Sequence, residues 1–205
     1  HKDRMKEVFA KNGIASPGFR IVADRKKFRF ADELSFPLIA KPATGHAKKG
    51  VRLIHNRKEL ENHLSTIESA PLLIEEFIEG DEIIAAGLIH RGRFHLVELT
   101  DKVLSAPPFF VDLMHLAPSK HFSLSRKVSE LGQKIADAFE IITSPLIMEI
   151  KVTQKEELSL IEAVPEFGGE FIPDIVIPRR TGYNFIAETI KASAGREFKL
   201  PQPQT

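Results

Sequence analysis

The chain has 205 residues, the length of one large domain or of two small lobes that share a core. A hydrophobic fraction of 42% and a charged fraction of 28% exclude a disordered or fibrous protein. The net charge of +1 argues against nucleic-acid and anionic-membrane partners, and the absence of cysteine excludes disulfides and thiolate metal sites. No apolar stretch reaches the roughly 18 residues of a membrane span, and the charged start is unlike a signal peptide, so we expect a cytoplasmic protein.

The first part of the chain predicts helices joined to short strands. Met5, Val8 and Phe9 fall at helical spacing. Because this helix begins at residue 1, we expect the chain to be a piece of a longer protein. The elements expected in this part are helices over 2–12, 24–34 and 56–68, capped by Asn56 in the last case, and strands over 36–42, 51–54 and 72–78.

The second part predicts two hairpins and two helices. These are a hairpin of 82–89 with 94–101, a helix over 125–140, a hairpin of 145–153 with 158–164, and a helix over 184–192. Residues 103–124 have no clear period and contain three prolines, which is typical of a functional or mobile loop. Because helices alternate with hairpins, we expect an α+β fold with antiparallel sheets.

The second hairpin places two carboxylates together. If 154–157 forms its loop, Glu149 lies directly opposite Glu162. The other face then receives an apolar set that would pack on a helix, namely Leu146, Met148, Ile150, Val152, Ile161 and Ala163. Opposed like charges destabilise a strand pair, and Mg²⁺ completed by phosphate oxygens would neutralise them. The alternative is that Lys151 and solvent screen two surface glutamates.

Two other segments contain residues that could bind a ligand, but each also fits an ordinary structural role when it is considered alone. The loop 43–50 offers backbone N–H groups and lysines to an anion, just after Lys41. It is not a Walker A pattern, so an ordinary exposed turn is its alternative. The segment 75–82 alternates acidic and apolar residues, which also fits an edge strand with a solvated face.

Taken in order, these pieces resemble the ATP-grasp superfamily, and within it the carboxylate–amine ligases related to carbamoyl-phosphate synthase and the L-amino-acid ligases. The resemblance covers nearly the whole chain. It rests on Lys2 with Met5-Lys6, Phe36 to Pro42, Gly50-Val51, Glu75 to Glu82, Thr100 to Lys102, His115 with Pro118-Ser119, Met148 to Lys151, Leu160 to Glu162, and Phe167-Gly168-Gly169.

The resemblance implies an ATP-grasp fold of two α+β lobes, each with an antiparallel sheet and helices, and a nucleotide between them. Residues 1–77 would form the small (lid) lobe with its leading helix, and 78–205 the large lobe with the metal-site hairpin. The amino-terminal Rossmann-like domain common in these ligases is expected to be missing from this chain.

The resemblance also implies a site for ATP and Mg²⁺, with Mn²⁺ as an alternative metal. Glu149 and Glu162 would hold the metal. The implied nucleotide-binding residues are Lys2 and Lys41 on the α- and β-phosphates, the loop residues Gly45, His46, Ala47, Lys48 and Gly50 over the β- and γ-phosphates, Glu75, Glu76, Phe77 and Ile78 around adenine, Glu82 on the ribose, and Lys102.

The implied reaction is phosphorylation of a carboxylate by ATP to an acyl phosphate, followed by attack of an amine. Its expected catalytic residues are Lys41, Glu166, His115 and Arg180, and its partners are small carboxylates and amines; a homo-oligomer is left open. Two further functions stay open: phosphorylation of bicarbonate or carbamate, as in carbamoyl-phosphate synthase, and a non-catalytic or decayed ATP-binding module.

Two positions depart from the family pattern. Glu166 stands where an arginine is usual, and Ile147 stands where a histidine or arginine is frequent. If strand pairing continues, Glu166 shares a face with Glu162 and would bind a metal or an amino group instead. Arg179, Arg180, Lys102 and His115 are the candidates for replacing the lost positive charge.

Overall fold

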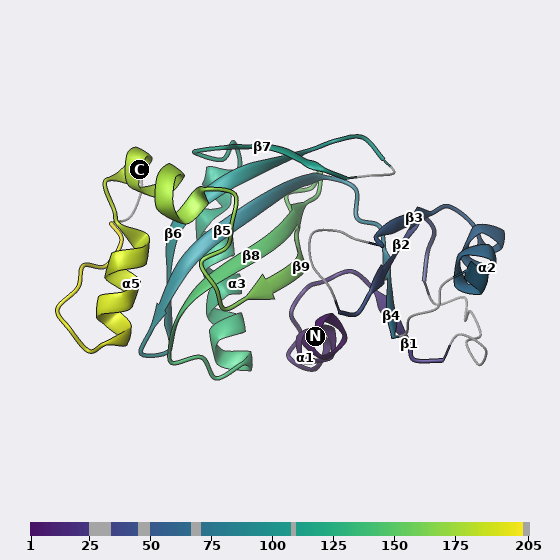
Figure 1. The fold of residues 1–205 in the computed structure, drawn as a ribbon, viewed down its shortest axis with the longest axis horizontal. Helices are drawn as coiled ribbons and strands as arrows, with labels where there is room; N and C mark the ends of the chain where they lie inside the picture. The colour runs from purple at the N-terminus through teal and green to yellow at the C-terminus, as the bar shows by residue number, and fades with distance from the viewer. Residues whose placement is uncertain (25–33, 45–49, 67–70, 108–109, 203–205) are drawn as a thin grey trace.

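The structure is a computed structural model that describes residues 1–24, 34–44, 50–66, 71–107 and 110–202. Two antiparallel sheets lie next to each other, each with its own helices (Figure 1). The expected α+β fold of two lobes is therefore confirmed. Among the described residues, no helix combines the length and the apolar character needed to cross a membrane.

The smaller sheet has the strand order β1-β4-β2-β3, and one helix packs on it. Its elements are β1 (Phe19–Val22), β2 (Leu38–Pro42), β3 (Arg52–Ile54), α2 (Arg57–Thr66) and β4 (Leu72–Glu76). Leu60 and Leu64 of α2 are buried with the strand residues in one core. The expected cap of α2 is confirmed, because Asn56 Oδ1 accepts a hydrogen bond of 3.0 Å from the N–H of Glu59.

The larger sheet has the order β7-β6-β5-β8-β9, and helices pack on both of its faces. Its strands are β5 (Asp81–His90), β6 (Arg93–Leu104), β7 (Asp112–Leu116), β8 (Thr143–Val152) and β9 (Leu158–Val164). The helices are η1 (Phe122–Leu124) and α3 (Ser125–Ala138), followed by η2 (Ile172–Val176), α4 (Ile177–Thr181) and α5 (Phe185–Ser193). Helix α3 packs on one face, and η2, α4 and α5 pack on part of the other. The uncovered part of that second face is turned toward the smaller sheet (Figure 1).

The first helix, α1 (Lys2–Lys11), lies between the two sheets (Figure 1). The sequence grouped it with the smaller lobe. Its apolar residues Met5 and Phe9 belong instead to the core of the larger sheet, where the Phe9 ring meets Phe139 edge-to-face with centroids 6.1 Å apart. Helix α1 therefore packs with the larger lobe although it precedes the smaller one in the chain.

The predicted pairing of Glu149 with Glu162 is confirmed, although the loop of this hairpin differs. Val152 pairs with Leu158, so the loop begins one residue earlier than expected, and a bulge at Ile161 restores the register at the glutamates. As a result Leu160, not Ile161, is buried in the core. Ile161 was wrongly assigned to the apolar face, because a bulge has no signature in residue alternation.

Other differences concern element ends. The expected helix over 24–34 lies almost wholly outside the described residues. The strand expected over 72–78 ends at Glu76, and the region 103–124 contains the edge strand β7 rather than loop alone. Between β4 and β5 the chain passes close over the end of β8 at Gly80, which has φ 143°. A Cβ atom there would lie 2.1 Å from the carbonyl oxygen of Val152, so this connection requires glycine.

Candidate functional site

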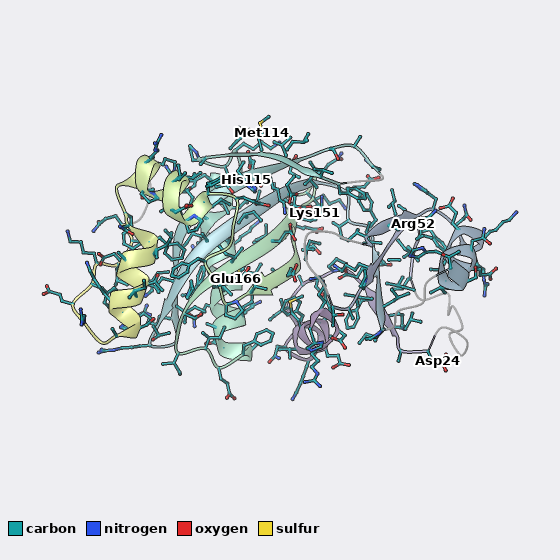
Figure 2. All side chains as sticks on the ribbon, in the orientation of Figure 1. Asp24, Arg52, Met114, His115, Lys151 and Glu166 are labelled. Atoms are coloured by element: carbon teal, nitrogen blue, oxygen red, sulfur yellow. The ribbon has the colours of Figure 1, made fainter. Side chains whose placement is uncertain are left out.

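A cavity of about 940 Å³ lies between the two sheets. It brings together most of the site residues expected from the sequence: Lys2, Lys41, Glu75, Glu76, Phe77, Ile78, Glu82, Lys102, Glu149, Glu162 and Glu166. Helix α1, strands of both sheets and the connection between the lobes supply these side chains. Lys151 on β8 lies at the junction of the two lobes (Figure 2).

Other expected residues are placed elsewhere. The loop residues Gly45 to Lys48 lie outside the described residues, and Gly50 is not part of the cavity wall. Arg180 is bound by Glu98, with Nη2 donating to Oε1 over 2.9 Å, so its charge is engaged away from the cavity. The Glu98 side chain is fully buried under α4, and this pair ties α4 to the sheet.

His115 approaches the cavity indirectly. Met114 and His115 lie on opposite sides of β7, with Met114 turned to solvent and His115 toward the interior (Figure 2). The His115 ring contacts the carboxylate of Glu170, and Glu170 itself lines the cavity. His115 is therefore one residue removed from the cavity wall.

On the smaller-lobe side of the cavity, one carboxylate binds two lysines. Glu75 on β4 contacts Lys41 of β2 through one oxygen and Lys6 of α1 through the other, the second contact being 2.6 Å. The exposed fractions of the side chains are 3% for Glu75, 0% for Lys6 and 10% for Lys41. Burial alone would raise the pKa of Glu75, but the two lysines outweigh it and hold that pKa below its ordinary value. Glu75 is thus a buried carboxylate kept in its charged form.

On the larger-lobe side, one lysine faces three carboxylates. Lys102 Nζ contacts Glu149, and lies 3.5 Å from Glu82 and 3.4 Å from Asp112. Lys151 Nζ is 3.2 Å from the other oxygen of Glu82. Burial raises the pKa of Glu82, and the charge of Glu149 raises it further, despite both lysines. Burial opposes the charged form of Lys102, yet Glu149 and the other carboxylates raise its pKa.

Each of the two opposed glutamates is bound by a lysine. Glu149 is bound by Lys102, and Glu162 accepts a 2.8 Å hydrogen bond from Lys2 of α1. Both glutamates line the cavity, and the lysines that contact them are Lys102 and Lys2. Within the described parts of the chain, no group of three or more His, Asp or Glu side chains is arranged to hold a metal ion. Any metal here would need ligands from a bound molecule or water.

The wall near the connection between the lobes is built from backbone. The N–H of Glu76 donates to Gly18 O over 2.9 Å, and that of Phe77 donates to Pro37 O over 2.9 Å. The Glu76 side chain accepts a 2.8 Å hydrogen bond from the N–H of Ser35. These bonds fix the strand end from which Ile78 enters the cavity wall.

The two departures from the family pattern have different surroundings. Glu166 lines the cavity, but β9 ends at Val164, so the condition that strand pairing continues to Glu166 is not met. The N–H of Glu166 instead bonds to Val164 O at 2.9 Å in a tight turn. Ile147 is buried in the core under α4 and α5, against Gly168. Its apolar side chain packs there, where a charged one would be desolvated.

Sequence reasoning missed the role of Lys6 and of Asp112. Lys6 was noted only as part of a motif, yet its side chain is fully buried. Its spacing gave a signal, because Lys2, Lys6 and Phe9 fall on one face of α1. Asp112 had none, because β7 lies in a segment without periodicity.

Comparisons with known proteins agree with this architecture. The family model described as ATP-grasp domain matches residues 34–174. The uncharacterized protein y4rH of Sinorhizobium fredii is 26% identical over 225 residues, which cover 100% of this chain and 44% of that protein.

Two solved structures share the fold. The L-amino acid ligase from Bacillus licheniformis has a TM-score of 0.79 at 23% identity, covering 96% of this chain and 48% of that one. D-alanine–D-alanine ligase from Bacillus anthracis complexed with ATP has a TM-score of 0.73 at 19% identity, covering 95% and 65%. This chain therefore spans about half the length of y4rH and of the L-amino acid ligase.

Proposed function

This chain belongs to the ATP-grasp domain family, and from that membership and the contacts above we propose that it binds ATP with Mg²⁺ and activates a carboxylate for attack by an amine. The observation that carries the proposal is the arrangement of charge across one cavity. Lys41 lies on the smaller-lobe side of it, and the opposed pair Glu149 and Glu162, each contacted by a lysine, lies on the other.

Lys41 and Lys2 are the proposed phosphate ligands. Both line the cavity, and both carry an ammonium group that a polyphosphate would bind as a point charge. Glu75 and Glu162, to which they are now paired, keep these side chains ordered. The family resemblance assigns the loop 43–50 to the β- and γ-phosphates, and its residues 45–49 lie outside the described residues.

Glu149 and Glu162 are the proposed metal ligands. Two opposed carboxylates fit Mg²⁺, a hard cation that takes oxygen ligands and is usually completed by phosphate oxygens and water. When bound, the metal would neutralise charge on the transferring phosphoryl group. Lys102 contacts Glu149, and Lys2 contacts Glu162.

The connection between the lobes is proposed to hold the adenine. Because the N–H of Glu76 is bonded to Gly18, the base would use the carbonyl of Glu76 and the N–H of Ile78. Phe77 supplies an apolar surface and lies 6.0 Å from the ring of Phe110. The ribose hydroxyls would bind Glu82 at the start of β5.

The proposed chemistry has two steps. A carboxylate oxygen of the substrate attacks the γ-phosphorus as the bond to the β–γ bridging oxygen breaks, which releases ADP. The amine nitrogen then attacks the acyl carbon and phosphate leaves, giving an amide. L-amino acid ligase and D-alanine–D-alanine ligase are the named relatives that support this class. Glu166 and Glu170, at the wall of the cavity, are proposed to face the substrates, with His115 behind Glu170.

The first test is calorimetric binding of adenosine 5′-(β,γ-imido)triphosphate to this chain, with and without Mg²⁺. We expect binding that requires Mg²⁺ and that Glu162→Gln weakens by about tenfold or more, the effect of losing one charged ligand. Glu130→Gln, on the exposed surface of α3, is the matched control and should leave binding unchanged. Absence of binding by the folded protein would contradict the proposal.

A further inference from the structure

Lys6 occupies the seam between the two lobes. Its Nζ contacts Glu75 of the smaller sheet at 2.6 Å and donates to the carbonyl oxygen of Leu160, on the larger sheet, at 3.2 Å. It also lies 5.7 Å from the centre of the Phe9 ring. The side chain is fully buried and does not line the cavity. Burying a lysine is costly unless its charge is paired, and Glu75 is the carboxylate that pairs with Lys6.

The charge balance of the group shows what that interaction does. Burial lowers the pKa of Lys6, and the charge of Glu75 opposes that shift. With both lysines protonated, Lys6, Glu75 and Lys41 carry two positive charges and one negative charge. Without Lys6, the carboxylate of Glu75 would neutralise Lys41 one to one. Lys41 is the member of the group that reaches the cavity. The second lysine therefore leaves a net positive charge for a ligand at Lys41.

We propose that Lys6 is a positioning residue for phosphate binding. By sharing Glu75 with Lys41, it keeps the ammonium group of Lys41 available to the phosphates of a nucleoside triphosphate. This inference rests on the proposed function. A positioning role differs from a purely structural one in its effect on binding, because loss of Lys6 would weaken binding of the phosphates and not of the nucleoside. Packing between the lobes would affect both parts of the ligand.

The test compares binding of adenosine 5′-(β,γ-imido)triphosphate and of adenosine by calorimetry. We expect Lys6→Met to weaken binding of the triphosphate by about tenfold or more, and binding of adenosine by less than about twofold. The double variant Lys6→Met with Glu75→Gln restores the net charge of the group. It should bind the triphosphate within about threefold of the wild type. Lys11→Met, an exposed lysine of the same helix, is the matched control.

Three results would overturn the inference: unchanged triphosphate binding by Lys6→Met, an equal loss for triphosphate and adenosine, or a double variant no better than the single one. If Lys6→Met does not fold, the double variant decides alone. It supports the inference if its triphosphate affinity stays within about threefold, and overturns it if the loss exceeds about tenfold. Failure of the wild type to bind the triphosphate would instead overturn the proposed function, so the two failures are distinguishable.

Discussion

The two sides of the cavity carry buried charge of opposite excess. On the smaller-lobe side, Lys6 and Lys41 share the single carboxylate of Glu75. On the larger-lobe side, Lys102 and Lys151 face three carboxylates, those of Glu82, Asp112 and Glu149. One group has a lysine in excess, and the other has a carboxylate in excess.

Under the proposed function, this difference would give the two sides of the cavity different ligands. An excess lysine favours an anion, whereas an excess carboxylate favours a cation. The pKa values agree with the division: that of Glu75 lies below its ordinary value because two lysines contact it, and that of Glu82 lies above because burial and Glu149 oppose its charge. These two charge excesses agree with the proposed binding of a polyphosphate and a divalent metal in this cavity.

The largest effect is expected from Glu75→Gln, which leaves Lys6 and Lys41 buried without their carboxylate. Removing one partner of a buried ion pair costs about 3–5 kcal/mol, because the remaining charge is desolvated and unpaired. Urea denaturation at pH 7 measures the free energy of unfolding. Glu61→Gln removes the exposed partner of Arg57 on α2 and should cost less than about 0.5 kcal/mol. Equal effects of the two substitutions would show that the buried group does not act as described.

The connection between β4 and β5, which joins the two lobes, is tested by Gly80→Ala. We expect a loss of about 2–4 kcal/mol, because φ 143° is strained for alanine and its Cβ would meet the Val152 carbonyl. Gly92→Ala, where a Cβ meets no atom within 4 Å, is the control and should cost only the strain of its φ of 74°. The difference in unfolding free energy between the two variants isolates the close contact; no difference would refute it.

A smaller effect is expected from Lys102→Met, which removes the shared lysine of the larger-lobe carboxylates. The cost should be about 1.5–3 kcal/mol, the range for hydrogen bonds to charged groups. Millimolar Mg²⁺ should restore part of this loss, because a cation can take the place of the ammonium group. Thermal unfolding with and without Mg²⁺ measures both effects. A variant that Mg²⁺ stabilises no more than the wild type would contradict an excess of carboxylate here.

The smallest effect concerns pH. The folded pKa of Glu75 is lowered, so its contribution to stability is present above the unfolded value of about 4.5 and is lost as pH falls through the folded value. The folded pKa of Glu82 is raised, so its contribution is present below about 4.5 and is lost as pH rises through the folded value. The cost of Glu75→Gln should therefore grow between pH 4 and 7, by on the order of 1 kcal/mol.

Over the same range, the cost of Glu82→Gln should shrink or become a gain, because glutamine resembles the neutral acid. Urea denaturation of both variants at several pH values between pH 4 and 7 tests the opposite signs. Parallel pH profiles for the two variants would remove the electrostatic distinction between the two sides of the cavity.

Much of this site could be read from residue order. Alternation along 145–164 placed Glu149 opposite Glu162, and the structure confirms the pair. The bulge at Ile161 could not be predicted, because it depends on the Cα pairing of two strands and leaves no trace in alternation. Arg180 is a comparable case. The sequence named it as a candidate cation of the site, but its partner Glu98 is 82 residues away along the chain, so their pairing could not be predicted.

The sequence by itself determined the α+β class, the strands and helices with regular periodicity, and the pair of glutamates, because these depend on local spacing. Only the tertiary structure decided that α1 packs with the larger lobe, that Lys6 is buried at the seam, and that Glu75 serves two lysines. Those outcomes depend on which surfaces meet when two sheets fold against one helix. Burial and the distance between charges, which set the chemistry of the site, exist only after that contact forms.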